Sequence, residues 1–265
     1  MAKKSLGNLL TKCISLDIFG YIRGGNVPAP KNEGKQMDID KIYLGDCRDY
    51  LKQLDGLDYV LVTDPPYNIG YDYDEYKDNL SETEYYKMLV DVIGKNMPAV
   101  ILHYPEYLHK LSIHLGEAPQ RIISWVYNSN TARQHRDIAF YRIKPNLKNV
   151  PGEYKNLNDH RIIERIERGK NPKCYDWIYN EMIKRQTKEK NKIEHPCVIP
   201  LKLMDKIIKM LPNEKIIIDP FVGSGTTLIA AKKNNRRFIG FEISKNYYEL
   251  ANRRLNEETA QIELF

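Results

Sequence analysis

Several features that mark particular classes of protein are missing from this chain of 265 residues. No apolar run approaches the length of a membrane span, and Lys12 interrupts the apolar core that a signal peptide would need. The four cysteines, at 13, 47, 174 and 197, have no paired spacing, which argues against a disulfide framework or a zinc site. There is neither a G-x-x-x-x-G-K-[ST] loop for a nucleoside triphosphate nor a complete G-x-G-x-x-G. These absences favour a cytoplasmic protein that does not cross a membrane.

The charge balance is mildly basic. The chain has 41 Lys or Arg against 35 Asp or Glu, a formal net charge of +6 and a pI near 8.9. Most of the excess lies in residues 144–194, which hold 13 Lys or Arg against 8 Asp or Glu, with tyrosines and a tryptophan interleaved. Such a balance suits a polyanionic partner. The length allows one α/β domain with an insertion.

The chain is organised around Asp64-Pro65-Pro66-Tyr67, which follows the apolar, β-branched run 58–63. This run predicts a buried parallel strand, and two prolines without N–H donors end it. Asp64 then stands at the carboxyl end of the strand, where open α/β sheets bind ligands. The Asp64 carboxylate and the Pro65 carbonyl could hold the N–H groups of an aromatic amine, while Tyr67 offers a flat face to an extruded base. The alternative is a simple proline-rich turn.

A second motif, Asp219-Pro220-Phe221-Val222-Gly223-Ser224-Gly225-Thr226-Thr227, lies between a strand-like run and a helical pattern. Gly223 and Gly225 permit a tight turn and a close approach to a ligand, and the following helix begins with unpaired N–H groups. The next strand ends on Glu242, about 20 residues past Gly223, which is the spacing of an acid that binds ribose hydroxyls. Glu242 could instead be a solvated charge.

Together, the two motifs resemble those of the amino-group DNA methyltransferases that use S-adenosylmethionine. The motif at 64–67 looks like the catalytic motif of the family, and the motif at 219–227 looks like its cofactor loop. Their order resembles the permuted β-group, in which target recognition lies between them. The resemblance covers roughly 39–255 and implies an α/β, Rossmann-like fold with a seven-stranded sheet and helices on both faces. It also implies S-adenosylmethionine as cofactor and double-stranded DNA as substrate, with base flipping.

The same resemblance divides the chain into four parts. These are an appendage of unknown role at 1–37, a catalytic half at 38–143, an inserted target-recognition region at 144–194 and a cofactor-binding half at 195–265. The basic and aromatic insert suits phosphate and base contacts, although charged stretches are often only solvated.

We expect the strands near 216–219 and 237–242 to insert between those at 42–46 and 59–64, so that the two motifs meet. Elsewhere the patterns predict a capping box at 81–84 and a strand at 99–103 ending on His103, which is structural or lies at the rim of the cleft. They also predict an antiparallel hairpin of 121–127 and 138–143, and helices at 161–168 and 177–190.

By resemblance, Asp46 accepts a hydrogen bond from the cofactor adenine, and Cys47 lines its pocket. The alternative for Asp46 is a cap of the following helix. A His-Pro segment beginning at His195 and including Pro200 resembles the one that supports the methionine end of the cofactor, although Ile199 replaces its lysine.

The predicted site has three sets of residues and no metal. The catalytic set is Asp64, Pro65, Pro66 and Tyr67. The cofactor set is Asp46, Cys47, Asp64, His195, Pro200, Asp219, Pro220, Phe221, Gly223, Ser224, Gly225, Thr226, Thr227 and Glu242. The DNA set is Arg161, Arg165, Arg168, Lys184, Arg185 and Lys188.

The first residue of the catalytic motif, Asp64, resembles the residue at this position in the adenine enzymes of the β-group, whereas the cytosine enzymes have Ser there. We therefore expect methylation of adenine at N6, with N4-cytosine methylation or a methylation-inactive DNA-binding relative as alternatives. A partner restriction endonuclease and a homodimer are further expectations of the resemblance.

Overall fold

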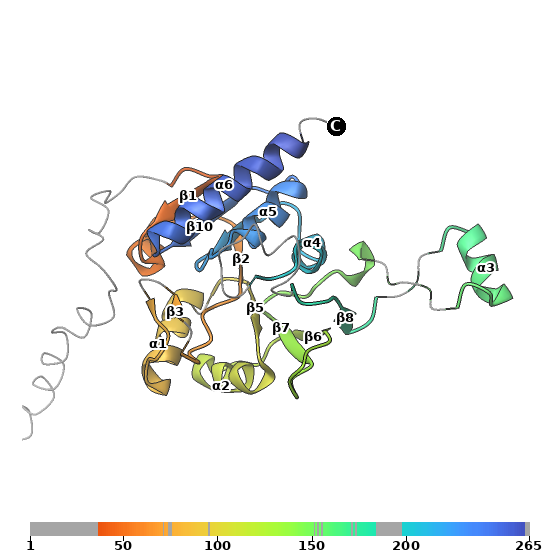
Figure 1. The fold of residues 1–265 in the computed structure, drawn as a ribbon, viewed down its shortest axis with the longest axis horizontal. Coiled ribbons are helices and arrows are strands. Elements are labelled where there is room, and N and C mark those ends of the chain that lie inside the picture. The colour runs from red at the N-terminus through yellow and green to blue at the C-terminus, as the bar shows by residue number, and fades with distance from the viewer. Residues whose placement is uncertain are drawn as a thin grey trace, which may run out of the picture.

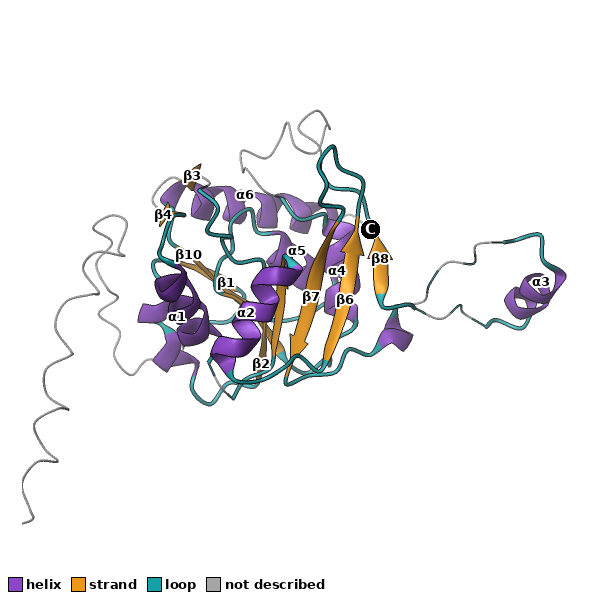
Figure 2. Cartoon of the chain, turned by 90° about the horizontal axis from the view of Figure 1, so that it is seen from below, coloured by secondary structure: helices purple, strands orange, loops and turns teal. Residues whose placement is uncertain are grey.

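A computed structural model of the chain describes residues 37–262, except 71, 74–75, 95, 151, 153, 155, 171, 173 and 184–197. Its main body is an open α/β sheet with helices on both faces, as predicted (Figures 1 and 2). Nearly all of the N-terminal appendage lies outside the described residues, and so do His195, Lys184, Arg185 and Lys188.

Within the described residues the sheet has eight strands in the order β1-β10-β9-β2-β5-β7-β6-β8. The strands are β1 Lys41–Leu44, β2 Tyr59–Thr63, β5 Ala99–His103, β6 Arg121–Val126, β7 His135–Tyr141, β8 Trp177–Tyr179, β9 Ile216–Asp219 and β10 Phe238–Glu242. All neighbours are parallel except β5–β7 and β7–β6. The predicted insertion of β9 and β10 between β1 and β2 is confirmed, and so is the antiparallel pairing of β6 and β7.

Strand β8 differs from the prediction of seven strands and of a helix over 177–190. Trp177 pairs with Ser124 of β6 in a parallel ladder. Ile178 is buried between two exposed aromatic residues, the period of two that a strand imposes. A further hydrogen bond joins β6 to the residue after β8: the indole N–H of Trp125 donates to the carbonyl of Asn180 at 2.7 Å. Aromatic side chains and this alternation favour a strand over a helix here.

The helices connect and cover the strands. They are α1 Glu82–Ile93, α2 Pro105–Leu115, α3 His160–Glu167, α4 Leu201–Lys209, α5 Thr226–Lys233 and α6 Lys245–Ile262, with short 3₁₀ turns η1 Cys47–Asp49, η2 Leu51–Leu54 and η3 Leu147–Asn149. A two-stranded hairpin, β3 Asp72–Tyr73 and β4 Tyr76–Lys77, lies outside the main sheet. The capping box is confirmed, because Ser81 and Glu84 exchange side-chain-to-backbone hydrogen bonds at the start of α1. Among the described helices, none is long and apolar enough to span a membrane.

Two apolar layers enclose the sheet. Val60 and Val62 of β2 belong to the layer that packs under α4 and α5, whereas Leu61 belongs to the layer under α1 and α2. Successive strand residues point to opposite faces, so a strand covered on both faces is apolar throughout. This explains why the apolar run before Asp64 is continuous. Asp64 follows the last residue of β2, at the carboxyl edge of the sheet, and is half-buried there.

Helix α3 stands away from this body in both views (Figures 1 and 2), and none of its residues is buried. The predicted helix at 161–168 is therefore confirmed, but the sheet does not support it.

Candidate functional site

A cavity opens at the carboxyl ends of β1, β10, β9 and β2. Its lining residues are Gly45, Asp46, Cys47, Arg48, Asp64, Pro65, Pro66, Tyr76, Met88, Ile199, Asp219, Pro220, Phe221, Val222, Gly223, Ser224, Thr226, Thr227, Phe241, Glu242, Ile243 and Tyr247. The two motifs therefore meet at one sheet edge, as the strand order predicts. Of the described residues in the predicted catalytic and cofactor sets, Tyr67, Pro200 and Gly225 do not line the cavity.

The glycine turn leads from β9 into α5. Gly223 lines the cavity at a φ of 51°. Gly225 has a φ of 84°, and a Cβ built on it would lie 3.1 Å from the Cβ of Ala251 and 3.2 Å from its Cα. Gly225 thus permits close packing of α5 against α6.

Two buried carboxylates hold this turn in place. Glu242 accepts hydrogen bonds from the amides of Gly223 at 2.7 Å and Ser244 at 2.9 Å. Asp219 accepts from the Thr63 hydroxyl at 2.7 Å and from the amide of Phe221 at 3.1 Å. Burial raises the pKa of Asp219 to about 6 and that of Glu242 to about 7. Glu242 is not a solvated strand-end charge.

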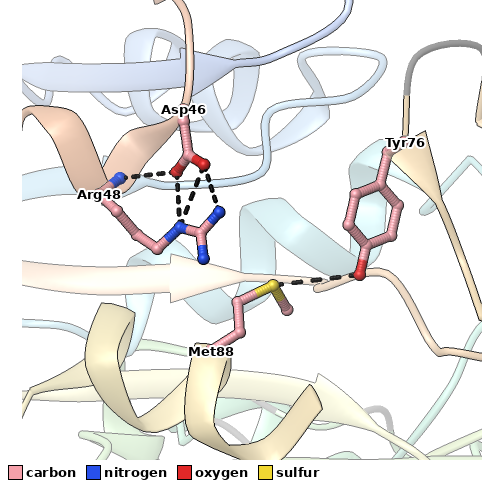
Figure 3. Close-up of polar contacts among 4 residues, drawn as sticks. All are labelled: Asp46, Arg48, Tyr76 and Met88. Carbon is pink, nitrogen blue, oxygen red and sulfur yellow. Dashed lines mark hydrogen bonds and ion pairs between the residues drawn. The ribbon is translucent and has the colours of Figure 1, made fainter. Parts of the chain in front are cut away.

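At the end of β1, Asp46 caps η1 by accepting from the amide of Arg48 at 2.9 Å, and it also binds the guanidinium of Arg48 (Figure 3). The capping alternative is therefore confirmed. Both side chains line the cavity, so the cap does not remove Asp46 from the predicted adenine site. Cys47 is buried beside them, and burial raises the pKa of its thiol.

Three further residues line this corner of the cavity and were not predicted from the sequence: Arg48, Tyr76 and Met88. Figure 3 shows Met88 of α1 pointing toward Tyr76 of β4, whose hydroxyl lies 4.0 Å from the Met88 sulfur. These residues belong to no motif, and their spacing along the chain carries no signal. Only the folding of the hairpin and of α1 against the end of β1 brings them to the cavity.

The turn at residues 64–67, the predicted catalytic turn, is supported by hydrogen bonds on the side away from the cavity. Asp64 lines the cavity and accepts a hydrogen bond from the hydroxyl of Tyr67. Arg136 of β7 donates to the same hydroxyl at 2.7 Å. Burial raises the pKa of Asp64 to about 6, against the opposing effects of the Arg136 charge and the Tyr67 hydroxyl. The carboxylate is therefore largely ionised at neutral pH.

Tyr67 does not offer the flat face that the sequence predicts. Its side chain is 1% exposed, and its ring centroid lies 4.6 Å from that of His103 and 5.2 Å from that of Tyr104. The hydroxyl is bonded on two sides, and this draws the ring into the protein behind the turn.

A second chain of hydrogen bonds reaches Pro66. The Tyr85 hydroxyl donates to the Pro66 carbonyl at 2.8 Å and lies 2.7 Å from Nε2 of His103. The amide of Tyr104 donates to Nδ1 of His103 at 2.8 Å, so the proton of the neutral ring sits on Nε2. Burial lowers the pKa of His103 to about 3. The structural role predicted for His103 agrees with this geometry.

The described members of the DNA set lie together on or beside α3. Arg161 pairs with Asp159 at 2.8 Å, and Arg168 pairs with Glu164. Arg165 lies over the ring of Tyr154, 6.0 Å from its centroid. These guanidinium groups are remote from the cavity.

The chemistry of the cavity fits S-adenosylmethionine. That cofactor joins an adenine and a ribose to a methionine chain that carries a sulfonium, an ammonium group and a carboxylate, with a net positive charge. The cavity presents four carboxylates, from Asp46, Asp64, Asp219 and Glu242, together with apolar walls that include Ile243. Anions suit the cationic chain, and apolar walls suit the flat base.

Comparisons with known proteins agree with this geometry. A family model described as DNA methylase (N6_N4_Mtase) matches residues 107–253. The type II methyltransferase M.HpaI of Haemophilus parainfluenzae is 30% identical over 241 residues, which cover 80% of this chain and 74% of that protein. The type II methyltransferase M.BglII of Bacillus subtilis is 29% identical over 260 residues, covering 83% and 70%.

Two solved structures share the fold. A complex of M1.HpyAVI with SAM has a TM-score of 0.52 and 24% identity over 81% of this chain and 98% of that one. The PvuII DNA methyltransferase, described as cytosine-N4-specific, has a TM-score of 0.57 and 16% identity over 86% and 93%. At such identities the likeness shows the fold alone. The family match and the M.HpaI relationship go further: this chain belongs to the N6/N4 DNA methylases, the S-adenosylmethionine-dependent amino-group DNA methyltransferases.

Proposed function

We propose that the protein transfers a methyl group from S-adenosylmethionine to the exocyclic N6 amino group of adenine in double-stranded DNA, after flipping the base out of the helix. One observation carries the proposal: Asp64, at the end of β2, lines the same cavity as Gly223 and Glu242 of the cofactor half. A hydrogen-bond acceptor for an amine thus stands beside a nucleoside site.

Bound S-adenosylmethionine supplies an electrophilic methyl group on its sulfonium. Asp46 would hold the adenine and Glu242 the ribose, and the residues around Gly223 would hold the methionine part of the cofactor. Asp64 and the Pro65 carbonyl would accept from the two N–H groups of the target, so that the nitrogen lone pair points at the methyl. No protein nucleophile is required, because alignment of the reacting atoms carries most of the rate.

Residues 144–194 are proposed to contact the DNA, with the helix α3 as an arm that presents arginines. Arg161, Arg165 and Arg168 are its cations, although Asp159, Glu164 and Glu167 balance their charge, and phosphate contacts position a protein on DNA without reading its sequence. In the same proposal, 38–143 and 195–265 form the two halves of the catalytic domain. The proposal includes a cytoplasmic location, where bacterial DNA is found, and a restriction endonuclease and a second copy of the chain as partners.

The choice of base is the finer part of the proposal. Asp64 as the first residue of the motif favours adenine by resemblance. The alternative is N4-cytosine methylation, because the matching family model, N6_N4_Mtase, takes in both kinds of amino-group methylase. An inactive relative is disfavoured because Asp64, Gly223 and Glu242 are intact and line one cavity.

Nucleoside analysis decides between these alternatives. Unmethylated bacterial DNA is incubated with the protein and S-adenosylmethionine, digested and analysed by mass. The expected product is the deoxynucleoside N6-methyl-2′-deoxyadenosine. Recovery of N4-methylcytosine alone would overturn the choice of base, and recovery of neither, with cofactor binding intact, would favour the inactive relative.

A further inference from the structure

Arg136 is a buried cation that contacts Tyr67 of the predicted catalytic turn on the side away from the cavity. It is 4% exposed and does not line the cavity. Its guanidinium lies over three aromatic rings, 4.8 Å from the centroid of Tyr67, 5.2 Å from that of Tyr104 and 5.4 Å from that of Trp125. Burying a charge is costly unless it is paired and hydrogen-bonded, so a cation in this position requires compensation.

The hydroxyl of Tyr67 provides the connection to the reacting edge. Arg136 donates to that oxygen at 2.7 Å, and the hydroxyl donates its own proton to Oδ1 of Asp64. The positive charge therefore polarises a hydroxyl that ends on a carboxylate, and hydrogen bonds in such a chain strengthen one another. A carboxylate has about four lone-pair sites, so the bond from Tyr67 leaves Asp64 able to accept from a substrate amine.

The strand pairing makes this support rigid. Arg136 belongs to β7, which pairs with β5 on one side and β6 on the other. Tyr67 immediately follows two prolines, whose rings fix the backbone dihedral φ. A buried side chain on a central strand thus reaches a restrained turn, which is the arrangement that holds a catalytic group in one orientation.

We infer that Arg136 is a positioning residue for methyl transfer, which acts through the Tyr67 hydroxyl to hold the Asp64 carboxylate in the orientation that accepts the amino group of the base. The inference rests on the proposed methyl transfer and applies to adenine and cytosine alike.

Tyr67→Phe is the sharpest test, because it removes one oxygen and keeps the aromatic ring. Arg136→Gln removes the charge of the group that donates to the Tyr67 hydroxyl. Arg133→Gln is the matched control, since Arg133 precedes the same strand, is exposed and pairs with Glu106. The measurements are kcat and KM for transfer of labelled methyl groups to unmethylated bacterial DNA between about pH 5 and 9, and calorimetric binding of S-adenosylmethionine.

The Arg136 charge and the Tyr67 hydroxyl both favour the ionised form of Asp64, while the neighbouring charge of Asp219 disfavours it. Both variants should therefore lower kcat by about tenfold, as loss of an aligned charged hydrogen bond does. They should also move the acid limb of the kcat profile to higher pH. Cofactor affinity should stay within about twofold, and Arg133→Gln should leave the acid limb in place.

An acid limb at the wild-type pH in Tyr67→Phe would overturn the inference, even if kcat fell, because a merely structural loss lowers kcat without moving the limb. An equal shift in Arg133→Gln would also overturn it. Should Arg136→Gln fail to fold, Tyr67→Phe decides alone. The assay counts labelled methyl groups transferred to DNA, whichever base receives them. An error in the proposed choice of base would therefore not alter this result.

Discussion

Glu242, the last residue of β10, accepts a hydrogen bond from the amide of Gly223 at 2.7 Å. The other carboxylate oxygen accepts from the amide of Ser244 at 2.9 Å. Since β9 and β10 are neighbours in the sheet, this one side chain ties the glycine turn after β9 to the end of β10. The acid that the spacing predicts as a ribose ligand therefore also shapes the loop that borders the cavity.

Glu242→Ala should weaken binding of S-adenosylmethionine. Bonds to a charged acceptor contribute about 1.5–3 kcal/mol, so the dissociation constant should rise about tenfold or more. The free energy of unfolding should fall as well, because the amides of Gly223 and Ser244 lose their partner. Glu242→Gln is the control: it keeps one acceptor oxygen and should lose less on both counts. Calorimetry with an unchanged affinity in the alanine variant would move the ribose site elsewhere.

Asp64→Ala should abolish methyl transfer and leave cofactor binding nearly intact, because Asp64 is proposed to face the base. Loss of one aligned acceptor should cost more than about 1.4 kcal/mol of transition-state stabilisation, that is, over tenfold in rate. Labelled methyl transfer and calorimetry on the same variant measure the two effects. Activity above about a tenth of wild type would reject Asp64 as the main acceptor.

Gly225→Ala should destabilise the fold by more than backbone strain alone. The positive φ of 84° disfavours any side chain, and the new Cβ would meet Ala251 at 3.1 Å. Gly116→Ala is a matched control, since its φ is 72° and a Cβ there meets nothing within 4 Å. The control should lose about 1–2 kcal/mol in urea unfolding. Equal losses in the two variants would show that the contact with α6 is unimportant.

The folded protein should become less stable as the pH rises from about 4 to 7. Burial raises the pKa of Asp64 and Asp219 to about 6 and that of Glu242 to about 7, so these acids bind more protons folded than unfolded across this window. His103, with its pKa lowered to about 3, has the opposite effect, because its ring binds a proton in the unfolded chain but not in the folded protein. Urea unfolding at several pH values measures the slope, and Asp219→Asn should flatten it. A slope unchanged by that variant would contradict the prediction.

Elements defined by local sequence were predictable. The continuous β-branched run before Asp64 reflects a strand covered on both faces, and the prolines end it at the sheet edge. The Ser81 capping box is likewise a local pattern. The orientation of Tyr67, by contrast, depends on distant contacts: its ring packs on His103 and Tyr104, and its hydroxyl accepts from Arg136, 69 residues away. Strand β8 was predicted as helix because its pairing with β6 cannot be read from three residues.

The same limit applies to the cavity. Acids at strand ends are recognisable, because a strand pattern and its last residue are both visible in the sequence. Arg48, Tyr76 and Met88 reach the cavity from a 3₁₀ turn, a small hairpin and a helix face. Each of these positions is unremarkable along the chain, and only the packing of the three elements makes them neighbours.

The salt dependence of DNA binding should report whether α3 contacts phosphates. Replacing Arg161, Arg165 and Arg168 together with Gln should weaken binding and reduce the slope of log affinity against log salt by about 0.9 for each phosphate that the arm no longer neutralises. Arg161 and Arg168 are already paired with Asp159 and Glu164, so binding to DNA must compete with these exposed pairs, which are individually weak. Asp159→Asn with Glu164→Gln is the opposite change and should strengthen binding by freeing both guanidinium groups. Fluorescence anisotropy between about 50 and 300 mM salt measures both slopes, and two slopes equal to that of the wild type would show that this arm is solvated and does not touch the DNA.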